Sequence, residues 1–273
     1  MSEPQIHPTA IIDSKVKIGK NVIIGPYAIV EGDIEISNNC KIAAHAILQG
    51  PLFLGPNCSI GFGTHIGGEP QDFAYKPGTT SYTHIGARNV IREYVTIHRG
   101  TKENSSTTIG DDNFLMVGVH IGHNCTLGNN CILANNVLLA GYTEFGNRVV
   151  VGGDVVFHQF MRVGDLAMVR GGTAWSKSIP PYTIGGGKNL LAGINIVGLR
   201  RAAIPQEIRT EIATAYKLLY RTNLNFSQAL EKASTLSWSP QTLKFWDFVR
   251  SPGKLGLAPA RQRGQRITGI PDE

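Results

Sequence analysis

The feature that most constrains this chain is a six-residue repeat of bulky apolar side chains between residues 109 and 169. Every sixth position of this stretch carries an aliphatic residue or Phe, without a gap. These positions are Ile109, Leu115, Ile121, Leu127, Leu133, Leu139, Phe145, Val151, Phe157, Val163 and Val169. Neither an α-helix nor a single strand has a period of six. The repeat instead predicts short strands joined by tight corners, with one bulky side chain turned inward on each face, as in a parallel β-helix.

The same register begins at Ile6 and is interrupted twice. It runs without a gap to Ile66, resumes at Ile85 and ends near Val169. Residues 68–84 are rich in turn formers and residues 100–108 are polar, so both segments are predicted to be loops outside the coil. The 25 hexads predict about eight three-sided coils, in which residues 18 apart stack at one strand spacing of ~4.8 Å.

The periodicity becomes helical after Ile204. Pro205 suits the first turn of a helix, and apolar residues then recur at helical spacing up to Leu219. Shorter helices are expected over residues 227–233 and 240–249. We therefore predict an all-β solenoid with a C-terminal α-helical subdomain that caps its open end. The expected boundaries are 1–190 for the β-helix, 191–251 for the helical domain and 252–273 for a disordered tail.

The excess positive charge lies in the last quarter of the chain. Before residue 200 there are 14 Lys and Arg against 14 Asp and Glu, and from Arg200 onward there are 12 against 6. An acidic or phosphate-bearing partner is one interpretation, and a basic tail without a partner is the other. No nucleic-acid partner is expected.

The sequence shows neither a run of about 18 apolar residues nor a secretory signal. We therefore expect a cytoplasmic protein without an integral membrane segment. The four cysteines occupy a slot of the hexad that otherwise holds small or β-branched residues, so we expect small buried hydrophobes rather than disulfides or zinc ligands. They are Cys40, Cys58, Cys125 and Cys131.

Several polar residues fall in one predicted column of the coil. His123, Gly141 and Gln159 are each third in their hexads and 18 residues apart, so they should stack. The missing side chain of Gly141 should leave a hole of ~10 Å between the other two. Tyr142 and His158 flank this hole, and His120 occupies the preceding corner. The alternative is a scatter of unrelated surface histidines.

This column has the groups needed for direct acyl transfer to an alcohol. A neutral His can act as general base near pH 7, and the backbone N–H of Gly141 can hold a developing oxyanion. The chain has no G-x-S-x-G motif and no H-x4-H pair, so neither a covalent serine route nor a histidine-bound zinc has support. We predict no cofactor and no metal.

Six segments carry a resemblance to a known family. They are IREYVTIHRGT (91–101), HIGHNCTLGNNCILANN (120–136), VFHQF (156–160), PPY (180–182), GINIVGLRR (193–201) and AYKLLYR (215–221). In these segments, and over nearly the whole chain up to about residue 250, the sequence resembles acyl-carrier-protein–UDP-N-acetylglucosamine O-acyltransferases. That family catalyses the first step of lipid A synthesis.

The resemblance implies a left-handed parallel β-helix, a homotrimer, and active sites between neighbouring prisms. It implies that His123 takes the proton of the sugar 3-hydroxyl, which attacks a 3-hydroxyacyl thioester on acyl carrier protein, while Gly141 N–H stabilises the oxyanion. It places Gly171 where the family limits acyl-chain length. The implied substrate-binding residues are Gln71, Asp72, His120, Asn124, Tyr142, His158, Gln159, Asn195 and Arg201. Acyl carrier protein is acidic, so the basic C-terminal quarter gains a candidate partner.

The chain departs from the family pattern near the site. Asn124 replaces an Asp, which lowers the expected strength of the base, since an amide carries no charge to stabilise the imidazolium. The other departures are Tyr142 for His, Ala74 for Lys, Val197 for Glu and Ala202 for Arg. Four alternatives therefore stay open: a different UDP-sugar such as a 3-amino sugar, a different acyl donor, a divergent paralogue, and a solenoid without enzymatic activity.

Overall fold

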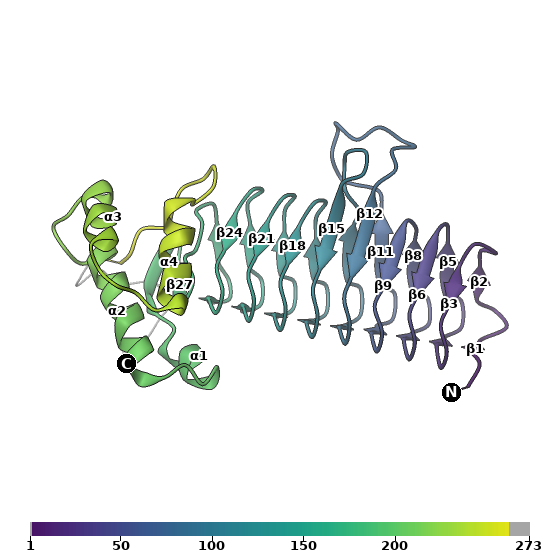
Figure 1. The fold of residues 1–273 in the computed structure, drawn as a ribbon. Coiled ribbons are helices and arrows are strands. Elements are labelled where there is room, and N and C mark those ends of the chain that lie inside the picture. Colours follow the sequence, from purple (N-terminus) through teal and green to yellow (C-terminus); the bar gives the residue numbers. More distant parts are fainter. Residues whose placement is uncertain (1, 262–273) are drawn as a thin grey trace.

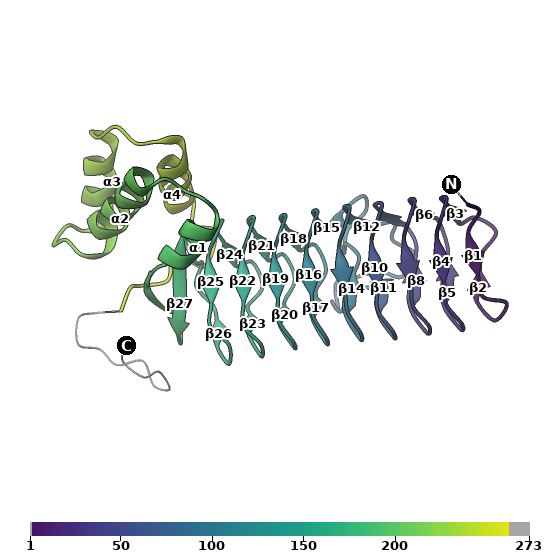
Figure 2. The same cartoon turned by 90° about the horizontal axis from the view of Figure 1, so that it is seen from below.

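A computed structural model describes residues 2–261 of the chain. They form a three-sided parallel β-solenoid with a group of helices at the end opposite to the N-terminus (Figures 1 and 2). The three sides are sheets, which we call the first, second and third faces. Their strands are parallel except for β28, which pairs antiparallel with β27 at the end of the first face.

The first face has 11 strands and the second has nine. The first face consists of β1 (Gln5–Ile6), β4 (Ile23–Ile24), β7 (Lys41–Ile42), β10 (Ser59–Ile60), β13 (Val90–Ile91), β16 (Phe114–Leu115), β19 (Ile132–Leu133), β22 (Val150–Val151), β25 (Met168–Val169), β27 (Thr183–Gly187) and β28 (Leu190–Ile194). The second face consists of β2 (Ile11–Ile12), β5 (Ile29–Glu31), β8 (Ile47–Gln49), β11 (His65–Gly68), β14 (Thr96–His98), β17 (His120–Ile121), β20 (Leu138–Leu139), β23 (Val156–Phe157) and β26 (Ala174–Trp175).

The third face has eight strands. It consists of β3 (Lys17–Ile18), β6 (Ile34–Ile36), β9 (Leu52–Leu54), β12 (Tyr82–Ile85), β15 (Ser106–Ile109), β18 (Thr126–Leu127), β21 (Glu144–Phe145) and β24 (Arg162–Val163). The loops that precede β12 and β15 project together from the prism (Figure 1). They correspond to the two predicted interruptions of the repeat.

The hexad register is confirmed strand by strand, because each of the 25 predicted apolar positions lies in one of the strands β1 to β25. Residues 18 apart pair directly, as Ile121 does with Leu139 and Leu139 with Phe157. The strands of the solenoid continue past Val169, the last apolar position of the repeat. Trp175 of β26 stacks on Phe157 and β27 pairs with β25. Since Trp is not aliphatic, the repeat had no visible continuation after Val169.

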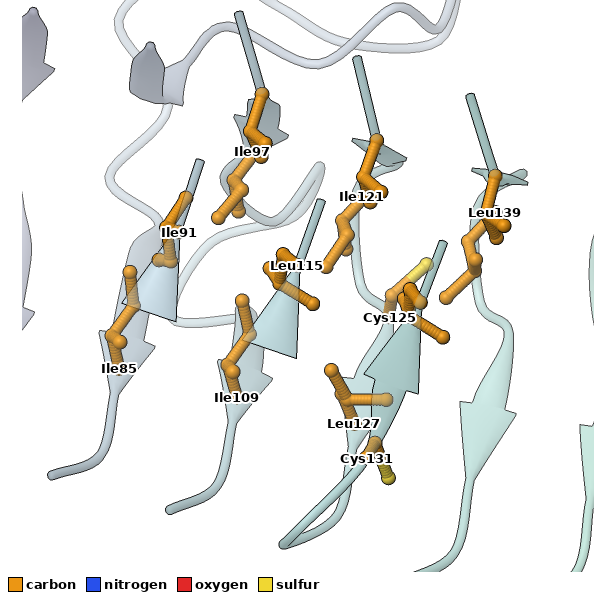
Figure 3. Close-up of a cluster of buried hydrophobic side chains, with 14 of the residues drawn as sticks. Ile85, Ile91, Ile97, Ile109, Leu115, Ile121, Cys125, Leu127, Cys131 and Leu139 are labelled. Atoms are coloured by element: carbon orange, nitrogen blue, oxygen red, sulfur yellow. The ribbon is translucent and has the colours of Figure 1, made fainter. Parts of the chain in front are cut away.

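The core is a set of side-chain columns that run along the prism (Figure 3). Ile97, Ile121 and Leu139 form one such column, and each is at most 1% exposed. The four cysteines are free and buried, as predicted. Burial raises the pKa of the Cys125 thiol to about 12, so this side chain packs as a small hydrophobe rather than acting as a nucleophile.

Four helices follow the last strand. They are α1 (Ile196–Arg201), α2 (Gln206–Tyr220), α3 (Phe226–Ser234) and α4 (Pro240–Arg250). The last three were predicted, and α1 was not. Their buried side chains, including Phe245 and Trp246, form a second cluster with Tyr182 from the end of the solenoid. Within residues 2–261 no helix has the length and hydropathy needed to cross a bilayer.

The segment after α4 differs from the expected disorder. Residues 252–261 cover the end of the solenoid, where Leu257 pairs with Ser178 and Ala260 with Leu191. Ala258 is fully buried. A composition rich in Gly and Pro suggested disorder, whereas the segment satisfies strand edges that the last coil leaves open. The remainder of the predicted tail, residues 262–273, falls outside the described residues.

Candidate functional site

A pocket of about 260 Å³ opens on the second face, beside the corner that leads to the third face. Its lining is Gln71, His98, His120, Gly122, His123, Leu138, Ala140, Gly141, Val156, Phe157 and Gln159. A larger hollow of about 450 Å³ lies between the third face and α4. Its charged groups are all engaged in ion pairs: Arg162 lies 3.0 Å from Glu144, Lys244 lies 3.3 Å from Asp165, and Asp247 pairs with Arg250. The smaller pocket is therefore the better candidate for chemistry.

The predicted column of His123, Gly141 and Gln159 exists. The N–H of Tyr142 donates to the carbonyl of His123 at 3.0 Å, and the N–H of Phe160 donates to that of Gly141 at 3.1 Å. The expected hole is not empty, however. A Cβ on Gly141 would lie 2.4 Å from Nε2 of His123. The missing side chain therefore makes room for the imidazole ring, which leans over the next coil.

His123 is held on several sides. Its Nδ1 lies 3.1 Å from Oδ1 of Asn124, and the edge of the ring meets Tyr142 at a centroid distance of 5.3 Å and an angle of 86°. Nε2 lies 3.8 Å from Oδ2 of Asp72, which comes from the loop before β12. That distance exceeds a direct hydrogen bond. Nε2 thus faces the pocket with no close partner among the described residues.

The loop before β15 supplies a residue that the sequence did not reveal. Thr101 donates to Oδ1 of Asn124 from its backbone N–H at 3.0 Å and from its hydroxyl at 2.9 Å. Its Oγ1 lies 3.0 Å from the hydroxyl of Tyr142. Both Asn124 and Tyr142 occupy left-handed corner positions, with φ of 59° and 60°. Thr101 ends the segment 91–101 that carries the resemblance and begins the polar stretch 100–108, but no spacing in the sequence related it to His123.

Two neutral histidines form the wall next to His123. The rings of His98 and His120 are 5.3 Å apart, and Nδ1 of His120 lies 2.8 Å from Oγ1 of Thr96. Burial, helped by the neighbouring His98 and His123, lowers the pKa of His120 to about 4. Burial also lowers the pKa of His98. Both rings are therefore uncharged near pH 7, which suits hydrogen bonding to a neutral sugar or amide.

His98 was not among the predicted site residues, although it lies in the segment 91–101 that carries the resemblance. Of the predicted set, the structure gathers Gln71, Asp72, His120, Asn124, Tyr142 and Gln159 around His123 and Gly141.

Four predicted residues lie apart from this group within one chain. His158 is exposed, with Nδ1 3.0 Å from the carbonyl oxygen of Gln159, and does not line the pocket. Asn195 caps α1, since its Oδ1 accepts from Gly198 N–H and its Nδ2 donates to Leu166, both at 2.9 Å. Arg201 is exposed at the end of α1. Gly171 follows β25 at a corner of the first face, where a Cβ would meet the carbonyl oxygen of Gly153 at 2.9 Å.

Two sequence profiles match this chain. Residues 15–50 and 106–141 match the bacterial transferase hexapeptide repeat. Residues 179–258 match the profile described as "Udp N-acetylglucosamine O-acyltransferase; Domain 2". The second match covers the helical region and the segment after it.

Curated relatives and solved structures agree with the profiles. An acyl-[acyl-carrier-protein]–UDP-N-acetylglucosamine O-acyltransferase of Burkholderia lata is 47% identical over 227 residues, which is 82% of this chain and 86% of the relative. The UDP-N-acetylglucosamine acyltransferase structure from Bacteroides fragilis is 38% identical with a TM-score of 0.87, and covers 93% of this chain and 99% of its own. The structure from Campylobacter jejuni is 34% identical with a TM-score of 0.88, and covers 94% and 100%. The chain belongs to the family of acyl-[acyl-carrier-protein]–UDP-N-acetylglucosamine O-acyltransferases.

Proposed function

We propose that this protein transfers a 3-hydroxyacyl chain from acyl carrier protein to the 3-hydroxyl of UDP-N-acetylglucosamine, the first step of lipid A biosynthesis, in the cytoplasm. The observation that carries the proposal is the position of His123. Its Nδ1 is held by Asn124 at 3.1 Å, while Nε2 faces the pocket beside the backbone of Gly141. This arrangement supports the assignment of His123 as the base and of Gly141 N–H as the amide donor.

The reaction needs no covalent enzyme intermediate. Nε2 of His123 takes the proton of the sugar hydroxyl while the oxygen attacks the thioester carbon. The carbonyl oxygen then carries a negative charge, which the N–H of Gly141 stabilises. In the described part of the chain this N–H has no hydrogen-bond acceptor, so it is free for that role. Collapse of the intermediate breaks the C–S bond, and the departing thiolate recovers the proton from His123.

The surrounding side chains position the acceptor. We assign Gln71 and Asp72 to the sugar, with the neutral His98 and His120 offering hydrogen bonds from the wall. Gln159 and the exposed His158 extend the site along the second face. The amide of Asn195 is occupied in capping α1, so Arg201 is the better of the two expected contacts to the nucleotide phosphates.

The exposed surfaces of the prism support a homotrimer. On the first face, every outward side chain from β13 to β25 is apolar: Val90, Phe114, Ile132, Val150 and Met168. The second face exposes Ile11, Leu138 and Val156. The third face is mostly polar, with Lys17, Glu35, His84, Thr126 and Glu144 exposed.

The first and second faces are adjacent and carry these apolar side chains. Such a pair of faces suits a closed cyclic assembly, in which the first face of one copy packs against the second face of the next. Because the His123 pocket lies on the second face, a neighbouring copy would complete it and could supply Arg201 and Gly171. We further propose that the basic residues after Arg200 bind acyl carrier protein, and that Gly171 limits the length of the acyl chain.

A second acceptor is favoured by one observation. Asn124 places a neutral amide, rather than a carboxylate, against His123. An amine nucleophile requires less help from a base than a hydroxyl does, so a UDP-sugar with a 3-amino group is the alternative substrate.

The test combines donors, acceptors and one pair of variants. Purified protein is given acyl carrier protein or coenzyme A carrying the same 3-hydroxyacyl chain, and UDP-N-acetylglucosamine or its 3-amino analogue, and products are identified by mass. Turnover should require acyl carrier protein and should be lost in His123→Ala. His84→Ala, on the polar third face, is the matched control and should stay active. Full turnover by His123→Ala, or turnover with coenzyme A alone, would contradict the proposal.

A further inference from the structure

We propose that Thr101 is a positioning residue that sets the tautomer of His123. Through its backbone N–H and its hydroxyl, Thr101 holds the amide of Asn124 with the oxygen toward His123. The imidazole proton is thereby kept on Nδ1, and Nε2 is left bare to act as the base. The catalytic meaning of this arrangement rests on the proposed function, whereas the tautomer itself does not.

The orientation of the Asn124 amide follows from its contact with the backbone. The two ends of an amide side chain are distinguished by their hydrogen-bond partners. The N–H of Thr101 can only donate, and it lies 3.0 Å from Oδ1 of Asn124. If the NH₂ group occupied that place, two donors would face each other at this distance. The oxygen is therefore the atom beside Thr101, and the same oxygen lies 3.1 Å from Nδ1 of His123.

The hydroxyls of Tyr142 and Thr101 form a chain of hydrogen bonds that all donate toward Asn124. The hydroxyl of Thr101 donates its single proton to Oδ1 of Asn124 at 2.9 Å. Its oxygen is then left to accept from the hydroxyl of Tyr142 at 3.0 Å. The order is Tyr142 to Thr101 to Asn124. Since Thr101 is only 7% exposed, water competes little for these bonds.

The consequence for His123 is a fixed assignment of its two ring nitrogens. A neutral imidazole has one N–H and one bare nitrogen, and the partner of one nitrogen decides the state of the other. An amide oxygen can only accept, so Nδ1 must carry the proton. Nε2, which points over Gly141, is then able to take a proton. An uncharged Asn can thus do the orienting work of a carboxylate because Thr101 fixes which end of the amide faces the ring.

The tautomer is measured directly by ¹⁵N NMR of protein labelled at histidine, with the His123 signals identified by their absence in His123→Gln. A protonated and a bare ring nitrogen have well separated shifts. We expect Nδ1 protonated and Nε2 bare in the parent protein. Thr101→Val keeps the backbone N–H that contacts Oδ1 of Asn124 and loses only the hydroxyl bond. It should therefore show a measurable fraction of the opposite tautomer, smaller than that in Asn124→Leu, whereas Thr101→Ser should show none.

Kinetics provide the second readout. Loss of one neutral hydrogen bond should lower kcat of Thr101→Val by about three- to tenfold. KM for the UDP-sugar should be unchanged, because Thr101 does not line the pocket. Thr101→Ser should restore kcat. Tyr142→Phe should add little to Thr101→Val, since both act in one chain of bonds. Thr83→Val is the matched control: its buried hydroxyl has no hydrogen-bond partner among the described residues, so kcat should not change.

Two results would overturn the inference. One is a parent His123 with the proton on Nε2. The other is a Thr101→Val variant with both kcat and ¹⁵N shifts unchanged. If the tautomer depends on Thr101 as expected but no acyl donor is turned over, the positioning role stands and the proposed function fails.

Discussion

Replacing Gly141 with Ala tests the contact on which the site depends. The added Cβ would lie 2.4 Å from both Cε1 and Nε2 of His123, whereas non-bonded heavy atoms settle at about 3.5 Å. The imidazole must therefore move by about 1 Å. A displacement of that size at a reacting group can cost about a hundredfold in rate. The moved ring also loses its bond to Asn124, worth about 1 kcal/mol, which corresponds to a fall in melting temperature of about 2–4 °C.

The assay measures initial rates with saturating acyl donor and acceptor, together with thermal melts of the same samples. Gly141→Ala should lose about a hundredfold in kcat while the fold persists. Gly153→Ala is the control, because its Cβ would meet only the carbonyl oxygen of Asn135, at 3.2 Å, and it should retain its kcat. A Gly141→Ala enzyme within twofold of the parent would refute the idea that the ring is held over this residue.

Three further predictions concern charge, pH and assembly. Asn124→Asp should raise turnover of the hydroxyl acceptor several-fold, because a carboxylate stabilises the imidazolium that forms; an unchanged or lower rate would count against the idea that the neutral amide of Asn124 weakens the base. The pKa of His120 is about 4 in the folded protein, against 6.5 ordinarily. As the pH falls, His120 therefore takes up a proton in the unfolded chain before it does so in the folded protein. The free energy of unfolding consequently decreases between about pH 6.5 and pH 4. In His120→Gln the melting temperature should fall less steeply across that window, and an identical slope would contradict the assignment. Ile132→Glu on the first face should dissociate the proposed trimer in sedimentation, whereas Thr126→Glu on the third face should not; a monomeric parent would contradict the proposed trimer.

The arrangement of the central site residues could be predicted from the six-residue spacing of the sequence. The hexad spacing placed His123, Gly141 and Gln159 in one column, and the structure confirms that placement through the pairing of Ile121 with Leu139 and Leu139 with Phe157. The spacing alone could not show that the imidazole of His123 leans over Gly141, because the direction of a side chain depends on the residues packed around it. Nor could it identify Thr101, whose position depends on where the loop before β15 returns to the prism. His98 lies in β14, next to the hexad position Ile97, so the repeat did place it on the second face, although nothing in the spacing marked it as a site residue.

The amino-acid sequence by itself determined the solenoid, its register and the inward side chains, because each coil repeats a local pattern and the strand spacing converts that pattern into stacking. It also determined the helices α2 to α4, whose apolar spacing is equally local. Only the tertiary structure decided which loop residues meet His123, which ring nitrogen faces the pocket, and why residues 252–261 are ordered. These features depend on contacts between segments far apart in the chain, and no local period encodes such contacts.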